Sequence, residues 1–183
     1  MPTGVSRVEA LHQALCSQSP TVEGWWSMAV FSNRRRGTRN WMMGHGFVVD
    51  LDYQNEKAEH SAPPDSARMQ MLEAVLENKF SAHLFHETPR GCRLIIVLDE
   101  PVDNVDVWKA ASRTVGKLID TVLRETALGT DHVGANGYAV DATVVSDCAK
   151  LIFLPNAVVH GTPRHADVLL LDDEAHPISR YFR

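Results

Sequence analysis

The sequence has little cysteine: its 183 residues include Cys16, Cys92 and Cys148, which lie far apart and form no CxxC pair. Three scattered thiols exclude a disulfide framework and a cysteine-rich zinc site, so no zinc is expected, and they fit a reducing cytoplasm. No apolar run approaches the roughly 18 residues that a membrane span needs, and the first residues lack the apolar core of a signal peptide. The composition therefore predicts a cytoplasmic protein without a membrane partner.

The sequence also lacks an excess of positive charge. Its 18 Lys and Arg face 23 Asp and Glu, a net charge of -5, which by itself argues against nucleic acid as a partner. The charge is unevenly spread, however, because four arginines fall within the short segment RRRGTR: Arg34, Arg35, Arg36 and Arg39. A net-acidic protein can still present a local cationic surface there, and a phosphate responds to the local field.

Length and composition are those of one globular domain over residues 1–183. Hydrophobic residues make up 44% and charged residues 22% of the chain, which excludes disorder and a coiled coil. Strand and helix patterns alternate in one run without repeats or low-complexity linkers, which indicates an α/β or α+β domain.

Local patterns predict the first elements. Ser6 and Glu9 form an S-x-x-E capping pattern ahead of an amphipathic helix. Residues 25–32 and the FVVDL segment at 47–51 predict two strands of a β-hairpin with the arginines at its tip. Trp25, Trp26 and Trp41 in this region can either stack on bases or pack in the core, and core packing is the more common outcome.

Further along the chain, Asp65 or Ser66 is expected to cap a helix that reaches Phe80, and Asp103 to cap a long helix. The apolar stripe of that second helix is predicted to include Val107 and Leu118. Strands are expected at 92–98, at 150–155 and at 166–172, and a glycine-rich loop at 128–141.

Two acidic residues follow the apolar strand at 47–51. Side chains alternate along a strand, so Asp50 and Asp52 are expected on one face, about 6.6 Å apart at roughly 3.3 Å per residue. Crowded carboxylates favour a divalent cation, and Mg²⁺ prefers such oxygen ligands. An ordinary strand that runs into a polar loop would give the same pattern.

Two later segments carry groups that suit phosphate or metal. Thr88, Arg90, Gly91 and Arg93 form a turn before a strand, where arginine forks and backbone N–H groups can hold phosphate oxygens, or where the arginines are simply solvated. Asp141, Lys150 and His160 flank a short apolar segment, where each is individually compatible with an ordinary turn or surface position.

The joint order of these three motifs resembles the archaeo-eukaryotic primase superfamily, in particular the primase-polymerase domains of plasmid, phage and mobile-element replication proteins. FVVDLD matches its D-x-D motif, TPRGCRLIIVL its turn into a strand, and DATVVSDCAKLIFLPNAVVHGT its third acid and late basic and histidine positions. The sequence departs from the family where Gly91 and Arg93 replace the serine and histidine of S-x-H, and where Phe153 replaces an arginine.

The resemblance implies an α+β, two-layer fold: an RNA-recognition-like antiparallel or mixed sheet flanked by helices, with an N-terminal helix and a β-hairpin added. It implies that Asp50, Asp52 and Asp141 are catalytic residues that hold two Mg²⁺ or Mn²⁺ ions. It implies that nucleotide-binding residues line the later motifs, namely Thr88, Arg90, Gly91, Arg93, Lys150 and His160. The arginines of the hairpin, Arg34, Arg35, Arg36 and Arg39, would then track the backbone of a single-stranded DNA template.

The activity implied is template-dependent nucleotidyl transfer from NTP or dNTP, which would make primers for replication of a plasmid, phage or mobile element. No Walker A motif is present, so a replicative helicase is expected either on the same polypeptide, if the chain is a fragment, or as a separate partner.

Other functions stay open. A catalytically degenerate domain that only binds single-stranded nucleic acid or nucleotide would carry the same motifs. A phosphohydrolase also uses a strand that ends in D-x-D, but Asp52-Tyr53-Gln54 lacks the Thr or Val expected two residues after the second acid. A rolling-circle endonuclease needs a His-hydrophobe-His motif, and His83-Leu84-Phe85-His86 has one residue too many. An RNA-recognition-like binding domain needs aromatic residues on its central strands, which are chiefly aliphatic here.

Overall fold

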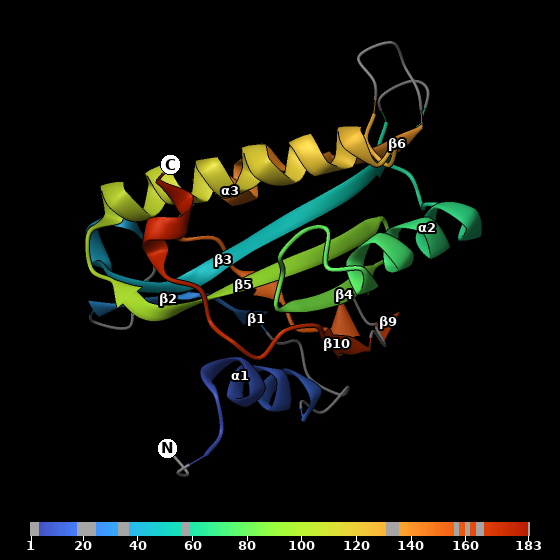
Figure 1. Cartoon of the computed structure of the whole chain (residues 1–183). Helices are drawn as coiled ribbons and strands as arrows, with labels where there is room; N and C mark the ends of the chain where they lie inside the picture. Colours follow the sequence, from blue (N-terminus) through green and yellow to red (C-terminus); the bar gives the residue numbers. More distant parts are fainter. Residues whose placement is uncertain are drawn as a thin grey trace.

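A computed structural model describes residues 4–17, 25–32, 37–55, 59–130, 136–155, 158–159, 162–163 and 167–182 (Figure 1). Its elements follow in the order α1 (Arg7–Cys16), β1 (Trp25–Trp26), β2 (Ala29–Phe31), η2 (Thr38–Asn40), β3 (Trp41–Gln54), α2 (Asp65–Leu76), β4 (Leu84–Thr88), β5 (Gly91–Val102), α3 (Val105–Glu125), β6 (Gly137–Val140), α4 (Ala142–Ser146), β7 (Ile152–Phe153), β8 (Val158–Val159), β9 (Thr162–Pro163), β10 (Val168–Leu170) and η3 (Ile178–Tyr181). The fold class is α+β, as the sequence predicts.

The central feature is a six-stranded antiparallel sheet. Its path runs β10-β4-β5-β3-β2, and β6 joins the same edge of β3 that β2 occupies further back. β3 is therefore the strand on which the sheet is organised: its 14 residues pair with β5 on one side and with β2 and then β6 on the other. The predicted hairpin between β2 and β3 is confirmed, although its tip at 33–36 lies outside the described residues.

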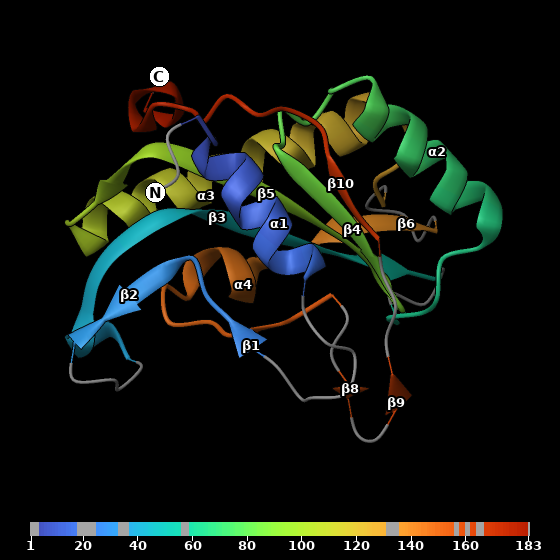
Figure 2. The same ribbon diagram turned by 90° about the horizontal axis from the view of Figure 1, so that it is seen from below.

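Helices cover both faces of the sheet. Figures 1 and 2 show α2 and α3 on one side and α1 on the other. On β3, Phe47, Val49 and Leu51 belong to the larger apolar cluster beneath α2 and α3, whereas Val48 belongs to the smaller cluster beneath α1. Alternate residues of one strand therefore enter two separate cores. Within the described residues, no helix combines the length and apolar character needed to cross a membrane.

The N-terminal capping box is present as predicted. The Glu9 amide donates to Ser6 Oγ at 3.1 Å, and the Ser6 amide donates to Glu9 Oε2 at 2.8 Å. The other two predicted caps are wrong: Pro64, without a side-chain cap, precedes α2 in place of Asp65 or Ser66, and Asn104 caps α3 in place of Asp103. Asn104 Oδ1 accepts two backbone N–H groups of the first helical turn, which fixes the start of that helix.

Several predicted elements differ in extent or position. The strand expected at 25–32 is two short strands, because β1 leaves the main sheet and pairs with β7. Val107 and Leu118, expected in the buried stripe of α3, are 38% and 51% exposed. Trp108, next to Val107, is buried. The glycine-rich loop expected at 128–141 contains β6. Glycine and alanine have low strand propensity, so the composition of this segment does not indicate a strand, and its pairing with β3 determines its structure.

The C-terminal segment is fastened across the sheet by a pair of buried histidines. The ring centroids of His83 and His176 lie 4.2 Å apart. His83 Nε2 donates to the Glu174 carbonyl at 2.9 Å, and its Nδ1 accepts from the Val97 amide at 3.0 Å. Arg180 donates to His176 Nε2 at 2.8 Å, which leaves the opposite ring nitrogen, Nδ1, to donate to the Tyr181 hydroxyl at 2.7 Å. Burial, with the neighbouring His83 and Arg180, lowers the pKa of His176 to about 4.

This pair predicts an acid-sensitive stability. The folded pKa of His176, about 4, is below its ordinary value of 6.5, so the unfolded chain binds more protons between these two pH values. The contribution is therefore present above pH 6.5 and is lost as the pH falls toward 4, and we expect about 2 kcal/mol from this histidine. Urea denaturation at pH 7.0, 5.5 and 4.5 measures the loss.

A His176→Gln variant separates this histidine from the rest of the protein. It is expected to be less stable at pH 7 but to lose less stability on acidification. Part of the slope should remain, because the pKa of His86 is also lowered to about 4 by burial. Parallel pH curves for the variant and the native chain would contradict the assignment.

Candidate active site

The two acids of the D-x-D motif lie on the sheet face opposite α2 and α3. Leu51, between them, points into the larger core and is completely buried, so Asp50 and Asp52 point the other way. Their side chains are 18% and 21% exposed, which is low for carboxylates. The alternation predicted from the sequence thus produces a half-buried acidic pair near the end of β3.

The short strand β6 brings the third acid to this pair. Leu51 pairs with Val140, and one position further along the Asp141 amide donates to the Asp50 carbonyl at 2.9 Å. Asp141 also caps α4: its Oδ1 accepts from the Thr143 amide at 2.8 Å and from the Thr143 hydroxyl at 2.7 Å. Residues 91 positions apart in the sequence are therefore neighbours in the sheet.

On the other side of Asp50 stands Arg93, directly opposite it on β5. Its Nε and Nη2 both donate to Asp50 Oδ2 at 3.2 Å, and its side chain is only 11% exposed. The sequence analysis assigned Arg93 to a nucleotide phosphate. The structure shows its guanidinium on a carboxylate that the same analysis assigned to a metal.

These charges act on Asp50 in opposite directions. Burial raises the pKa of its carboxyl above the ordinary value, Arg93 lowers it, and the carboxylates of Asp52 and Asp141 raise it again. The net direction is upward, because one guanidinium does not offset burial together with two nearby negative charges. An additional cation beside Asp50 would therefore favour the charged form of its carboxyl.

His86 is a site residue that the sequence analysis did not identify. It lies opposite Arg93 on β4 and is 1% exposed. Its Nδ1 donates to the Glu87 carbonyl at 3.2 Å, and within the described residues its buried Nε2 has no hydrogen-bond partner. An unpaired buried acceptor costs about 1–3 kcal/mol. Burial, with the nearby Arg93, lowers the pKa of His86 to about 4, so the ring is neutral and Nε2 holds a lone pair.

A sequence signal for His86 exists in the turn at 89–90. A two-residue β-hairpin loop pairs residue 88 with 91, and counting back from there pairs 86 with 93. The HLFH segment by itself suggests only a metal motif, and the pairing of His86 with Arg93 is what brings this histidine to the site. His60, which also lies beside the site, places Nδ1 3.3 Å from Asp52 Oδ2.

The β4–β5 hairpin carries the other predicted phosphate ligands. Thr88 and Gly91 pair directly, and Arg90 is an exposed turn residue whose carbonyl accepts from the Tyr53 amide at 2.7 Å. Gly91 has a packing role, because a Cβ there would meet the backbone carbonyl oxygen of Leu51. This glycine is therefore required by the close approach of β5 to β3, whatever else the turn binds.

Lys150 is half-buried and lines a small cavity. That cavity is also lined by Val48 of the smaller core and by Trp108 of the larger core. Trp26 and Trp41 pack in the protein interior: Trp26 contacts the smaller core, and the ring of Trp41 lies 6.4 Å from that of Trp108.

The remaining predicted binding residues are not seen beside the acids. Arg39 is exposed in η2, at the opposite end of β3, about 30 Å from Asp50 at roughly 3.3 Å per residue. Arg34, Arg35, Arg36 and His160 lie outside the described residues. A nucleic-acid path from Arg39 to the acids would therefore have to follow the length of β3.

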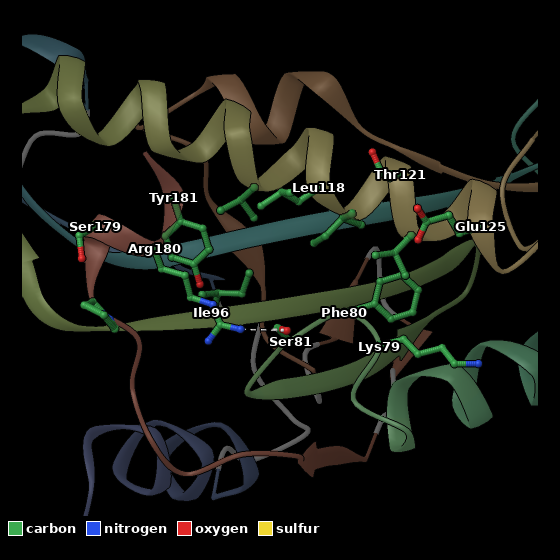
Figure 3. Close-up of a pocket in the computed structure, with 14 residues that line it drawn as sticks. Lys79, Phe80, Ser81, Ile96, Leu118, Thr121, Glu125, Ser179, Arg180 and Tyr181 are labelled. Atoms are coloured by element: carbon green, nitrogen blue, oxygen red, sulfur yellow. Dashed lines mark hydrogen bonds between the residues drawn. The ribbon is translucent and has the colours of Figure 1, made fainter. Parts of the chain in front are cut away.

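A pocket of about 910 Å³ lies elsewhere, between α3, η3 and the segment after α2 (Figure 3). Phe80, Leu118 and Tyr181 are among its lining residues, and Arg180 donates to Ser81 Oγ at 3.2 Å at its edge. Ile96 of β5 also lines it and faces the larger core, whereas Arg93 faces the other side of the sheet. The pocket and the acidic group are therefore on opposite faces of the sheet.

The donor set at the acids fits a hard divalent cation, since it consists of carboxylate oxygens on two adjacent strands. These carboxylates do not form a complete set of metal ligands. Among the residues that the structure describes, no group of three or more His, Cys, Asp or Glu side chains is arranged to hold a metal ion. Arg93 holds Asp50, Thr143 holds Asp141, and His60 contacts Asp52. Each acid thus has a partner that a metal would have to replace or share.

The sequence matches no family model and no curated protein. Among solved structures, the chain is similar to the AEP domain of the primase-polymerase of cyanophage S-2L, at 11% identity with 94% of each chain covered and a TM-score of 0.46. It is also similar to the polymerase domain of ligase D from Mycobacterium tuberculosis in complex with DNA, at 16% identity and a TM-score of 0.49. That likeness covers 79% of this chain and 51% of the other, so the chain spans about half of that protein's length.

At these identities and TM-scores, neither likeness assigns a function to this chain.

Proposed function

We propose that this domain catalyses template-dependent nucleotidyl transfer as a primase-polymerase that makes primers in replication. One observation carries the proposal: Asp50 and Asp52 lie on β3, and the Asp141 amide, directly after the adjacent strand β6, donates to the Asp50 carbonyl at 2.9 Å. Burial, together with the charges of Asp52 and Asp141, raises the pKa of Asp50, and a bound cation would favour its charged form.

Asp50, Asp52 and Asp141 would hold Mg²⁺ or Mn²⁺ in this proposal. Such an ion, when bound, stabilises the charge that develops during phosphoryl transfer. Oxygen donors suit these ions, and the half-buried positions of Asp50 and Asp52 limit competition from water. Asp50 is paired with Arg93 and Asp141 accepts from Thr143, so these contacts would have to change or be shared before the site binds an ion.

The groups around the acids would bind the nucleotide and its template. Arg93 is a cation beside the acids, and Thr88 and Arg90 lie in the adjoining hairpin, so these residues, with Lys150, would contact the triphosphate. Arg39, with Arg34, Arg35 and Arg36 beyond the described part, would contact the DNA backbone further along β3. A helicase partner stays a prediction from the family resemblance.

A second function is favoured by a specific contact. The bidentate contact between Arg93 and Asp50 gives the most buried acid an internal partner, and a domain that had lost catalysis could keep exactly that arrangement while still binding nucleotide or single-stranded DNA. The absence of a three-ligand group among the described residues points the same way.

Primer synthesis distinguishes these functions. The protein is incubated with a single-stranded DNA of mixed sequence, labelled NTP or dNTP, and Mg²⁺ or Mn²⁺, with the Asp50→Ala/Asp52→Ala double variant as a control. We expect template-dependent products from the native chain only. Nucleotide binding in a calorimeter without products would favour the binding domain, and phosphate release without a template would favour a phosphohydrolase.

A further inference from the structure

Four side chains of four adjacent strands form a row across the sheet face. Asp141 follows β6, Asp50 lies on β3, Arg93 on β5 and His86 on β4, each opposite the next in the register. Opposed residues on antiparallel strands have Cβ atoms about 5 Å apart, so each side chain reaches its neighbour. Arg93 thus stands between two acceptors, the Asp50 carboxylate and the His86 ring.

Only one of these acceptors is in use. Arg93 donates twice to Asp50 Oδ2, at 3.2 Å each, whereas His86 Nε2 is buried and accepts from no described residue. The tautomer of His86 is set by its bond to the Glu87 carbonyl, which leaves Nε2 as a lone-pair acceptor rather than a donor. Buried acceptors usually have a donor, and a movement of the neighbouring Arg93 guanidinium would supply one to His86 Nε2.

Arg93 and a divalent cation would compete for the negative charge of the Asp50 carboxylate. Arg93 lies against Asp50 Oδ2 and is more buried than the carboxylate itself. A divalent ion on Asp50 would bring like charge next to the guanidinium at a site that is poorly screened by water. Both Arg93 donors contact Oδ2, so an ion that shares this oxygen favours a turn of Arg93 away from Asp50. The acceptor that lies in the register of Arg93 on the far side is His86.

We propose that Arg93 is an internal counter-cation that occupies Asp50 until a divalent cation displaces it, and that His86 Nε2 is the acceptor that receives the displaced guanidinium. His86 is then a positioning residue, which acts through Arg93 and does not touch substrate. The inference rests on the proposed function in one respect, that a divalent cation binds at the acids.

The test measures metal affinity without nucleotide, template or turnover. Mn²⁺ binding to the full chain is followed by the loss of the free Mn²⁺ signal in electron paramagnetic resonance. Arg93→Met is expected to bind Mn²⁺ about tenfold more tightly than the native chain, because no internal cation has to be displaced. The matched control is Arg113→Met, which removes the same charge from an exposed position of α3 and should change the affinity less than about twofold.

A double-mutant cycle tests the histidine. His86→Leu, similar in size, should weaken Mn²⁺ binding by about threefold or more in the native background, because the displaced guanidinium then lacks its acceptor. The same change in the Arg93→Met background should have no effect on the affinity. An equal loss in both backgrounds would overturn the role of His86, and an affinity of Arg93→Met equal to or below that of the native chain would overturn the role of Arg93.

A measurement on the native chain covers the case in which His86→Leu does not fold. The nitrogen resonance of His86 Nε2 should move upfield when Mg²⁺ saturates the protein, as the lone pair gains a donor, while Nδ1 keeps its proton. A resonance that stays in place at saturation would overturn the proposal. Absence of Mn²⁺ binding in both the native chain and Arg93→Met would instead refute the two-metal function itself.

Discussion

Replacing Asp50 by Asn is expected to reduce metal-dependent nucleotide incorporation by about 10³-fold or more. The substitution keeps the shape of the side chain and removes the charge that a cation needs. It also removes the acid that lies centrally, next to Asp52 along β3 and next to Asp141 across the sheet. Single-turnover incorporation on a primed template, at saturating Mn²⁺, measures the change.

Two controls show whether the loss is chemical. Asp99→Asn makes the same change at an exposed position of β5, where the side chain only accepts from the next amide, and should keep full activity. Thermal unfolding of Asp50→Asn is needed as well, because Arg93 loses its charged partner and the fold is expected to lose about 1–3 kcal/mol. An Asp50→Asn protein that stays folded and retains a tenth of the activity would refute catalysis by this acid.

The largest effect on stability is expected from Gly91→Ala. The added Cβ would overlap the backbone carbonyl oxygen of Leu51 and approach Asp52 Cα to 3.1 Å, and neither backbone atom can yield without disturbing the pairing of β3 with β5. We expect a loss of about 3 kcal/mol in the free energy of unfolding, or a decrease of roughly 6–12 °C in Tm. Urea and thermal denaturation measure both quantities.

Gly116→Ala provides the comparison. There the new Cβ meets Val145 Cγ1 at 3.0 Å, a side-chain atom that can move, in the middle of α3, where alanine favours the helix. The change should stay within about 1 kcal/mol of the native chain. Equal losses for the two variants would show that the approach of β5 to β3 does not require the glycine at 91.

The parts of the site that follow from local rules could be predicted from the sequence. Alternation along an apolar strand suffices to put Asp50 and Asp52 on one face, and a branched segment with turn residues at both ends suffices to identify β5. The capping pattern of Ser6 and Glu9 is equally local. Each of these features depends on residues within a few positions of one another, which is the range over which a single sequence is informative.

The parts that depend on pairing could not be predicted. β6 consists of Gly137, Tyr138, Ala139 and Val140, a segment with little strand character, and it is held by the edge of β3 that β2 leaves open. The contact between Arg93 and Asp50 depends on the register of β3 against β5, which the sequence does not state. The predicted caps of α2 and α3 were wrong because Asp65, Ser66, Asp103 and neighbouring Asn104 offer nearly equivalent starts.

The row formed by Asp141, Asp50, Arg93 and His86 also gives the site a direction. Four strands at roughly 4.8 Å spacing make it about 14 Å long, negative at the β6 end and positive to neutral at the β4 end. An elongated anion lying along it is repelled at one end and attracted at the other. A molecule that is more negative at one end than at the other therefore has different energies in its two orientations along the row, and the orientation with the more negative end toward β4 is favoured.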